Sequence, residues 1–292
     1  EAEFVSHAEI QRLAPAIDVS QLEGGYFVPG DGYLDPRQCA LAFAAAAQDL
    51  GVDIRFLTQA TGLKIDKQRV TGVTTNKGEF SAHQTIVTAG PWTGLLARHA
   101  GIDLPMQTIR HQRVRTVAAG SIPNHHPVVR VTDVSCYVRP EQSGYLYGFF
   151  EPNPTAIDLE SESSDFRTDD LVVPCKTMSE ALRRLAPVFP ILGELDIAER
   201  QQGITTFAPD GQYLIGPVPG VDGIYLASGC AALGIAGSAA IGNWLAKSVI
   251  DGQPHDALSG FTHQRFGDQA EDRDWVRASS LQFYANYYAL NS

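Results

Sequence analysis

The longest apolar stretch of the chain, residues 224–250, limits the fold more than any other feature. It is interrupted by Asn243 and Lys247 and is rich in glycine, which predicts a buried strand, a glycine-rich turn and a helix rather than a membrane span. Glycine lets the backbone approach another group closely, and the positive end of the following helix points at the same place. Two interpretations follow: a turn that binds a cofactor, or glycines needed only for tight packing of strand against helix.

The acidic balance of the chain narrows the classes of partner. A formal net charge of -11 over 292 residues argues against nucleic acid, because phosphate binding needs a basic surface. The four cysteines lie far apart without a C-x-x-C pair, which predicts reduced thiols and no metal site. We therefore expect a globular protein with a large core and no membrane span.

Local patterns predict an α+β or α/β fold. Residues 36–50 follow Asp35 as an N-cap and carry proline at the first helical position, which predicts a helix ended by Gly51. Residues 52–90 alternate polar and apolar side chains between polar turns, which predicts four strands in a meander. Residues 107–150 repeat this alternation and predict a second sheet.

Between residues 203 and 216 the chain reverses between two apolar stretches. A β-branched run breaks at Pro209, Asp210 and Gly211 and then resumes. Proline favours the first position of a turn and Asp-Gly tolerates positive φ, so the pattern predicts a β-hairpin. From residue 152 to 175 the sequence is acidic and weakly periodic, which predicts an irregular excursion.

Five segments, in order, resemble one family. They are TIVTAGPWTGLLA (85–97), RHQRV (110–114), CYVRPEQSGYLYGFFEPNP (136–154), the long stretch 203–254, and the closing RFGD and YANYY (265–288). Together they resemble the FAD-dependent amine oxidoreductases of the D-amino acid oxidase-like family, most closely the dimethylglycine and sarcosine dehydrogenase group. The resemblance covers nearly all of residues 5–290.

The resemblance implies a substrate domain with a mixed β-sheet, interleaved with the remainder of an FAD-binding domain. It assigns residues 36–95 and 203–252 to the FAD-binding domain, residues 5–35 and 96–202 to the substrate-binding domain, and residues 253–292 to a C-terminal tail.

The dinucleotide-binding part of the family is not found in this chain. A search for G-x-G-x-x-G finds only residues 30–35, where the third glycine is missing and no strand precedes. The family normally begins with a Rossmann unit that carries this motif and, in this group, a histidine that can bind the flavin covalently. We expect both to lie upstream of Val5.

By resemblance, the cofactor is FAD. The resemblance places it against a strand end, a segment that approaches its pyrophosphate, the predicted hairpin and the glycine-rich turn. The corresponding residues are Ala60, Gly90, Trp92, Gly203, Pro209, Asp210, Gly211, Gly229, Leu233, Gly234 and Ile235. The alternative is that these residues have structural roles only, as a strand end, a packed tryptophan and ordinary turns. Relatives such as glycine oxidase carry an arginine in the turn, but this chain has Ala232, which argues against a simple amino acid as substrate.

The implied reaction is oxidation of a secondary or tertiary N-methylated amine, such as a sarcosine- or dimethylglycine-like compound, by hydride transfer to flavin N5. His111 and Tyr137 are the candidate catalytic residues, since a histidine can accept or relay the amine proton. Arg139 and Tyr147 are the candidate substrate-binding residues, with the excursion at 155–172 near the mouth of the pocket. The alternative for His111 is a hydrogen-bonded structural histidine.

Two other functions stay open at the level of the sequence. One is a truncated, non-catalytic fragment that keeps a ligand pocket, and the other is a stand-alone amine oxidase that passes electrons to oxygen. A folate-binding domain or an electron acceptor is the expected protein partner besides the amine substrate. The expected compartment is the cytoplasm, or the mitochondrial matrix in a eukaryote.

Overall fold

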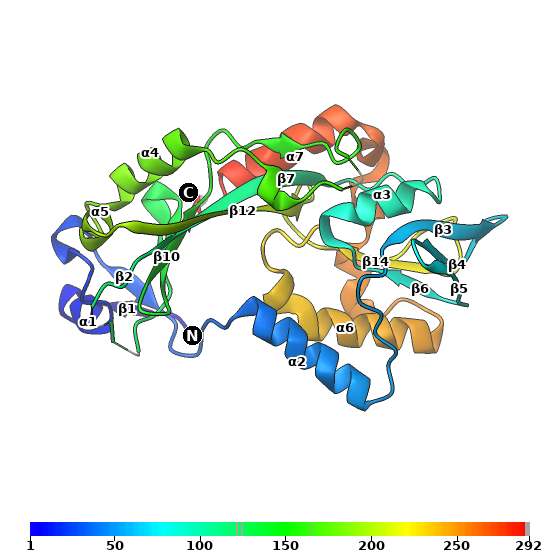
Figure 1. Ribbon diagram of the computed structural model, residues 1–292, viewed down its shortest axis with the longest axis horizontal. Coiled ribbons are helices and arrows are strands. Elements are labelled where there is room, and N and C mark those ends of the chain that lie inside the picture. The colour runs from blue at the N-terminus through cyan, green and yellow to red at the C-terminus, as the bar shows by residue number, and fades with distance from the viewer. Residues whose placement is uncertain (121, 124, 164, 290–292) are drawn as a thin grey trace.

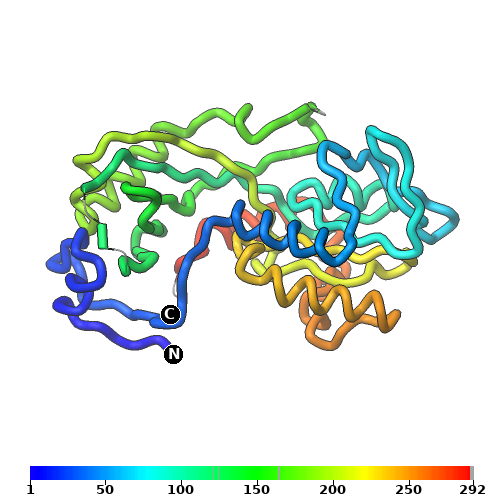
Figure 2. The backbone as a smooth tube through the Cα atoms, turned by 60° about the horizontal axis from the view of Figure 1, so that its bottom comes forward, coloured from blue at the N-terminus to red at the C-terminus, as the bar shows by residue number. Residues whose placement is uncertain are grey.

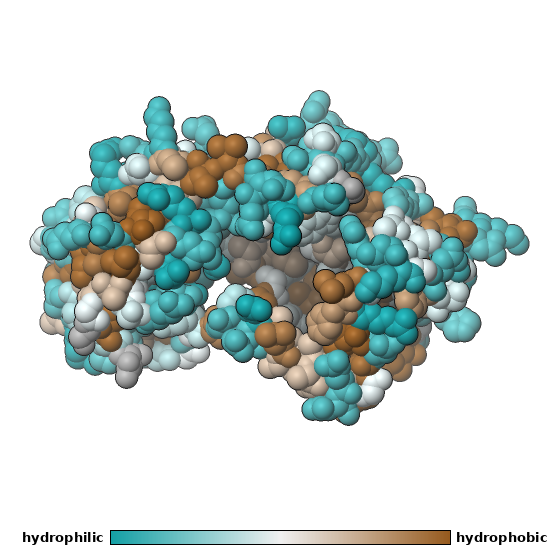
Figure 3. All heavy atoms as spheres, in the orientation of Figure 1, coloured by the Kyte–Doolittle hydropathy of each residue, from teal (hydrophilic) through white to brown (hydrophobic). Residues whose placement is uncertain are grey.

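Two long strands, β7 (Gln107–Thr116) and β12 (Ile197–Phe207), run antiparallel between two lobes of the molecule (Figure 1). The computed structural model describes residues 1–120, 122–123, 125–163 and 165–289. Among these residues no helix is both long enough and apolar enough to cross a membrane. Figure 3 shows a hollow between the lobes, in which apolar side chains are visible.

The first lobe is built on an antiparallel sheet of six strands. Its order is β11-β7-β10-β9-β8, with β12 paired to the other edge of β7. The added strands are β8 (Val129–Val131), β9 (Cys136–Glu141), β10 (Gly144–Phe149) and β11 (Ala156–Ile157). The expected mixed sheet is wrong for this lobe, because every pair is antiparallel. A hairpin of two turn residues joins β9 to β10, a connection that only antiparallel strands allow.

Helices and a small sheet complete the first lobe. They are α1 (His7–Leu13), α4 (Cys175–Leu185), α5 (Ile191–Glu194), β1 (Glu3–Val5) and β2 (Gly25–Phe27). The amphipathic α4 buries Met178, Ala181 and Leu185 against the sheet. The acidic excursion contains only β11 and a short 3-10 turn, Thr168–Asp170.

The second lobe holds two three-stranded sheets. One is the meander β3 (Ala60–Asp66), β4 (Arg69–Thr75) and β5 (Gly78–Ser81). The other has the order β13-β14-β6, from β13 (Leu214–Pro217), β14 (Ile224–Ser228) and β6 (Thr85–Val87). The single four-stranded meander expected over residues 52–90 is therefore wrong. Only three of its strands form the meander, while β6 pairs in parallel with β14, where both strands are largely buried.

The strand, turn and helix predicted over residues 224–252 are confirmed. After β14 the chain turns at Gly229 and enters α6 (Gly234–Asp251), which ends at Gly252 with φ of 67°. A left-handed glycine is the usual C-terminal end of a helix. A third helix of this lobe, α3 (Thr93–Arg98), buries Ala97 in the same core as Val87 and Leu226.

The hairpin predicted at residues 203–216 is wrong. Strand β12 pairs with β7, whereas β13 pairs with β14, so the two strands belong to different sheets. The turn itself exists, since the Gly211 N–H donates to the Ala208 carbonyl at 2.9 Å. A local sequence of the kind that usually closes a hairpin therefore carries the chain from one lobe to the other in this protein.

Helix α2 (Pro36–Asp49) confirms the predicted helix and its cap. The Asp35 carboxylate accepts from the N–H groups of Arg37 and Gln38. None of its residues is buried, and Leu41 and Phe43 are exposed. Figures 1 and 2 show α2 beside α6, linked to the rest of the chain by two extended segments.

The C-terminal region expected as a tail forms a helix, α7 (Arg273–Ala285), that packs on β7 and β12. It buries Val276, Ser280 and Tyr284. Ala97, which falls in the range 96–202 expected for the substrate-binding domain, packs in the core of the second lobe. The assignment of the lobes to FAD and substrate binding stays a prediction.

Candidate active site

Three side chains from distant parts of the chain form one hydrogen-bonded array. The Nδ1 atom of His111 lies 2.8 Å from the Tyr284 hydroxyl, and its Nε2 atom lies 3.1 Å from the Tyr137 hydroxyl. The histidine comes from β7, Tyr137 from β9 and Tyr284 from α7. The predicted pair of His111 and Tyr137 is thus brought together, although the contact does not test its chemical role.

The register of the sheet explains how Tyr137 reaches His111 across an intervening strand. Tyr137 lies opposite Gly148 of β10. A Cβ atom at Gly148 would collide with the Tyr137 ring, so only glycine lets this ring lie over β10. The rings of His111 and Tyr137 are stacked, with centroids 6.0 Å apart and an interplanar angle of 11°.

Burial sets the protonation of the array. It lowers the pKa of His111 to about 4, with the nearby Arg113 cation adding to the effect, so the imidazole is neutral at pH 7. Burial also raises the pKa of Tyr137 to about 12 and raises that of Tyr284 further, so both hydroxyls keep their protons. Because a neutral imidazole has one donor and one acceptor nitrogen, one tyrosine donates to His111 and the other accepts from it.

A cavity of about 590 Å³ opens beside this array. His111 and Tyr137 line it together with β12, the polar turn at residues 168–169 and Ala232 of the glycine-rich turn. The acidic excursion therefore borders the cavity that contains the two candidate catalytic residues. Most of the residues that line the cavity are polar or charged, which suits a small polar or charged ligand.

Two predicted substrate-binding residues do not take the expected places. The prediction that Tyr147 binds the substrate is wrong. Tyr147 pairs with Val138 and points to the opposite face of the sheet, where it is buried in the core beneath α4. Arg139 is on the same face as Tyr137, but its guanidinium lies 2.5 Å from the Glu141 carboxylate and stacks on the ring of Tyr33. It does not line the cavity.

The glycine-rich turn and the segment Gly90–Trp92 come together at the carboxyl end of β14. The Ser228 hydroxyl donates to the Gly90 carbonyl at 3.0 Å. Gly229 and Gly90 both have positive φ, as do the non-glycine residues Ala231 and Ala232. The Tyr287 hydroxyl donates to the Ala231 carbonyl at 3.0 Å and so ties the turn to the C-terminal region.

The start of α6 fits a flat ring bearing acceptor atoms. This helix has no side-chain cap, so the N–H groups of its first turn are unused by the helix itself. Leu233 and Ile235 expose 39% and 41% of their surface there, and Trp92 beside Gly90 exposes 38%. Apolar surface next to uncapped amides suits an isoalloxazine ring, whose acceptor edge gains from a helix N-terminus.

The other predicted cofactor residues are more dispersed. Asp210 binds Arg265 through two hydrogen bonds of 2.7 and 2.8 Å. Burial would raise the pKa of Asp210, but these bonds outweigh it and the pKa is lowered. A Cβ at Gly211, where φ is 68°, would collide with the Phe283 ring, so the Pro209 turn packs against α7. Gly203 pairs with His111, while Ala60 is exposed in the separate meander sheet.

Tyr284 was missed by the sequence prediction, although the closing YANYY was part of the resemblance.

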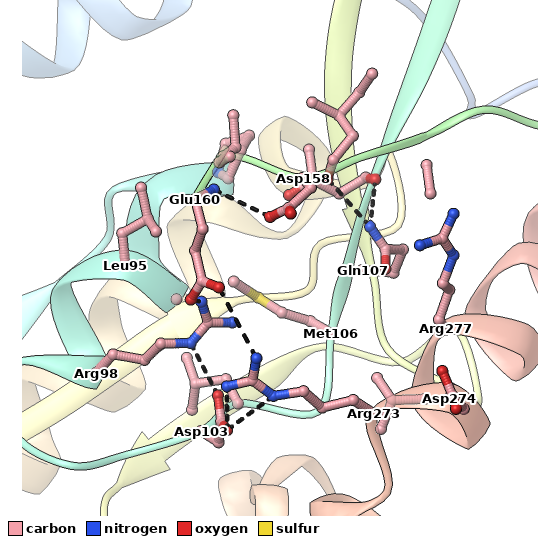
Figure 4. A pocket seen from close by; sticks show the side chains of 18 of the residues that line it. Leu95, Arg98, Asp103, Met106, Gln107, Asp158, Glu160, Arg273, Asp274 and Arg277 are labelled. Carbon is pink, nitrogen blue, oxygen red and sulfur yellow. Dashed lines mark hydrogen bonds and ion pairs between the residues drawn. The ribbon is translucent and has the colours of Figure 1, made fainter. Parts of the chain in front are cut away.

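Helix α7 is held in place by a charged cluster that Figure 4 shows from close by. Arg273 lies 2.7 Å from Asp103, which also binds Arg98 at 2.9 Å, and both arginines pair with Glu160 of the excursion. This cluster links α7, α3 and the excursion.

A neutral histidine thus lies between two tyrosines, beside a cavity that Ala232 of the glycine-rich turn also lines. The family model described as FAD dependent oxidoreductase matches residues 1–248. The chain therefore belongs to this FAD-dependent oxidoreductase family, as its sequence motifs predicted.

Individual proteins agree with this assignment. Human mitochondrial sarcosine dehydrogenase is 29% identical over 298 residues, 99% of this chain and 32% of that protein. The mouse mitochondrial pyruvate dehydrogenase phosphatase regulatory subunit is 29% identical over 297 residues, 99% of this chain and 33% of that protein. The 4-methylaminobutanoate oxidase (formaldehyde-forming) of Paenarthrobacter nicotinovorans is 26% identical, with 99% and 35% covered. The chain spans about a third of these relatives' length.

Solved structures share the fold. The L-proline dehydrogenase of P. horikoshii has a TM-score of 0.79 at 23% identity, covering 91% of this chain and 68% of that one. The glycine oxidase of Geobacillus kaustophilus has a TM-score of 0.73 at 21% identity, covering 91% and 67%. These likenesses confirm the predicted α+β class of an FAD-dependent oxidoreductase.

Proposed function

We propose that this chain forms the substrate site of an FAD-dependent enzyme that oxidises a secondary or tertiary N-methylated amine. The observation that carries the proposal is the array of Tyr137, His111 and Tyr284, two members of which line the cavity next to Ala232. The names of the relatives support the substrate class, since sarcosine and 4-methylaminobutanoate are both N-methylated amines.

The proposed residues would hold the flavin at the start of α6 and beside Gly90. When bound, the flavin supplies the hydride acceptor, its N5 atom. Leu233 and Ile235 would offer the apolar surface for the ring, and the free N–H groups of the first turn of α6 would be available to its acceptor atoms.

The chain's own polar residues would prepare the amine. An amine gives up a hydride from the adjacent carbon only when its nitrogen is unprotonated, so a proton must first leave it. In our proposal the Tyr137 hydroxyl contacts the amine and passes its proton to His111. A histidine with a pKa of about 4 does not retain that proton at pH 7, so it passes the proton on to water in the cavity that it lines and serves as a relay rather than a store. Tyr284 holds the ring by its hydrogen bond to Nδ1.

A matched panel of amines tests the substrate class. The holoenzyme is mixed without oxygen with sarcosine, dimethylglycine and 4-methylaminobutanoate, and the loss of flavin absorbance is followed. Glycine and 4-aminobutanoate, which lack only the methyl groups, are the controls. We expect bleaching by at least one methylated compound and much slower bleaching by its unmethylated partner. Equal bleaching by both members of every pair would contradict the proposal.

A second candidate is a binding module without redox chemistry. The relative whose name describes a phosphatase regulatory subunit favours it, at 29% identity over 99% of this chain. This candidate predicts that the flavin of the purified protein is absent, or is bound but not bleached by any amine. A stand-alone oxidase would instead bleach and recolour in air without another electron acceptor.

The remaining partners and the compartment are proposals as well. Sarcosine and dimethylglycine dehydrogenases named as mitochondrial are among the relatives, so a mitochondrial matrix location is proposed for a eukaryotic source and the cytoplasm otherwise. A folate-binding domain would receive the one-carbon unit released from an N-methyl group. An electron acceptor would reoxidise the flavin.

A further inference from the structure

Arg113 occupies the cavity wall two residues beyond His111 on the same face of β7. Two residues along a strand place side chains roughly 7 Å apart. Arg113 lies opposite Gly148, which in turn lies opposite Tyr137, so these three form one row across the sheet. The middle of the row carries no side chain. The cation therefore faces the same space as the hydroxyl of Tyr137.

The hydrogen bonds of Arg113 leave most of its guanidinium unused. Its Nε donates to the Gln201 Oε1 atom at 2.6 Å. The Gln201 amide is oriented by its own donation to Glu199 at 2.8 Å, so its oxygen is the atom presented to Arg113. Throughout the described part of the chain, no carboxylate pairs with Arg113 and no acceptor is recorded for its two terminal nitrogens.

Three neighbouring arginines of the same sheet are paired with carboxylates, whereas the exposed Arg130 and Arg200 have no such pair in the described part of the chain. Arg110 lies 3.2 Å from Glu151, Arg115 lies 3.0 Å from Glu199, and Arg139 lies 2.5 Å from Glu141. Glu199 attracts the Arg113 cation but is already bound to Arg115, so a ligand carboxylate would supply Arg113 with a direct counter-charge. Arg113 and the exposed Arg200 both border the cavity, but Arg113 is the more buried of the two, and its open fork matches the two oxygens of a carboxylate.

We propose that Arg113 binds the carboxylate of the substrate, which makes the substrate an N-methylated amino acid rather than a simple methylated amine. The inference rests on the proposed function and assigns to Arg113 the role that the sequence suggested for Arg139. Tyr137 and Arg113 would hold the amine end and the carboxylate end of a short amino acid, since both residues line the same cavity. Gln201 and Glu199 position the guanidinium.

The test compares ligands with and without a carboxylate. Methoxyacetate has the length and the carboxylate of sarcosine but no nitrogen, so its binding to the holoenzyme measures the carboxylate contact apart from turnover. Binding is followed by calorimetry and by the change in flavin absorbance. N-methylethylamine is the matched substrate that lacks the carboxylate.

We expect Arg113→Gln to weaken methoxyacetate binding by about a hundredfold, because a charged pair is lost from a partly buried site. The variant should raise the KM for sarcosine by a similar factor and change the KM for N-methylethylamine far less. Arg113→Lys should restore part of the binding, since it keeps the charge but not the fork. Arg139→Gln is the control, because that guanidinium is paired with Glu141 and does not line the cavity.

Three results would overturn the inference: no methoxyacetate binding by the unaltered protein, equal losses for Arg113→Gln and Arg139→Gln, or an equal loss with both amines. Failure of the proposed function is distinguishable. A protein that binds methoxyacetate through Arg113 and oxidises no amine would refute the oxidation and uphold the carboxylate site. A protein that oxidises methylated amines, but whose methoxyacetate binding is unaffected by Arg113→Gln, would uphold the oxidation and refute the carboxylate site.

Discussion

Replacing His111 by glutamine should flatten part of the pH dependence of stability. Burial lowers the pKa of His111 from 6.5 to about 4. Between these two values the unfolded chain binds more protons than the folded one, so this histidine makes the protein less stable as the pH falls from 6.5 towards 4. Above pH 6.5 both states are neutral at this position and the effect disappears.

The size of the effect follows from the two pKa values. With 6.5 in the unfolded state and about 4 in the folded state, linkage gives a loss of about 2 kcal/mol between pH 7 and pH 5. Other groups titrate over the same range, so only the difference between the protein and its variant is informative. His111→Gln removes the titrating ring and should abolish this part of the loss.

Urea unfolding of the holoprotein and the His111→Gln variant at pH 7 and pH 5 measures this loss of free energy of unfolding. The exposed His83→Gln serves as a control that should leave the pH dependence unchanged. If the unaltered protein and His111→Gln lose the same free energy of unfolding between the two pH values, His111 is not held neutral by burial. The proton relay would then lose its physical basis.

Other substitutions probe the array and its supports. Tyr137→Phe removes one hydroxyl and should lower kcat by about 10²-fold, measured by rapid mixing, with unchanged kcat excluding a proton-transfer role. Tyr284→Phe should lower the free energy of unfolding by about 1–3 kcal/mol, because the His111 ring loses a buried partner; an unchanged urea midpoint would contradict that hydrogen bond. Gly148→Ala should displace the Tyr137 ring and lower kcat, whereas Gly242→Ala, which meets nothing within 4 Å, should not, as paired kinetics can show.

Regular local patterns were enough to predict several elements. The Asp35 cap with Pro36 predicts α2, and the glycine-rich stretch after β14 predicts the turn and α6, because caps and periodicity act within a few residues. The turn at Pro209 shows the limit of such patterns. Its residues specify a reversal, but the partner of each flanking strand is decided by long-range pairing, and here the partners lie in two different sheets.

The site residues divide in the same way. Tyr147 was placed on the wrong face although the information was present: the two-residue turn at 142–143 pairs Glu141 with Gly144, which puts Gly148 rather than Tyr147 opposite Tyr137. Tyr284 could not be found from spacing, because it lies 173 residues from His111 and meets it only when α7 packs on the sheet. No local pattern encodes that contact.

The central proposal is that a C–H bond next to the amine nitrogen is broken as the flavin is reduced, with the nitrogen held by Tyr137 and its proton relayed by His111. Rapid anaerobic mixing of the holoenzyme with sarcosine, unlabelled or carrying deuterium on both carbons beside nitrogen, measures this step directly. We predict that deuterium slows the bleaching of the flavin several-fold. Bleaching at the same rate with both substrates, under conditions where the rate still depends on Tyr137, or no bleaching by any N-methylated amine, would contradict the account.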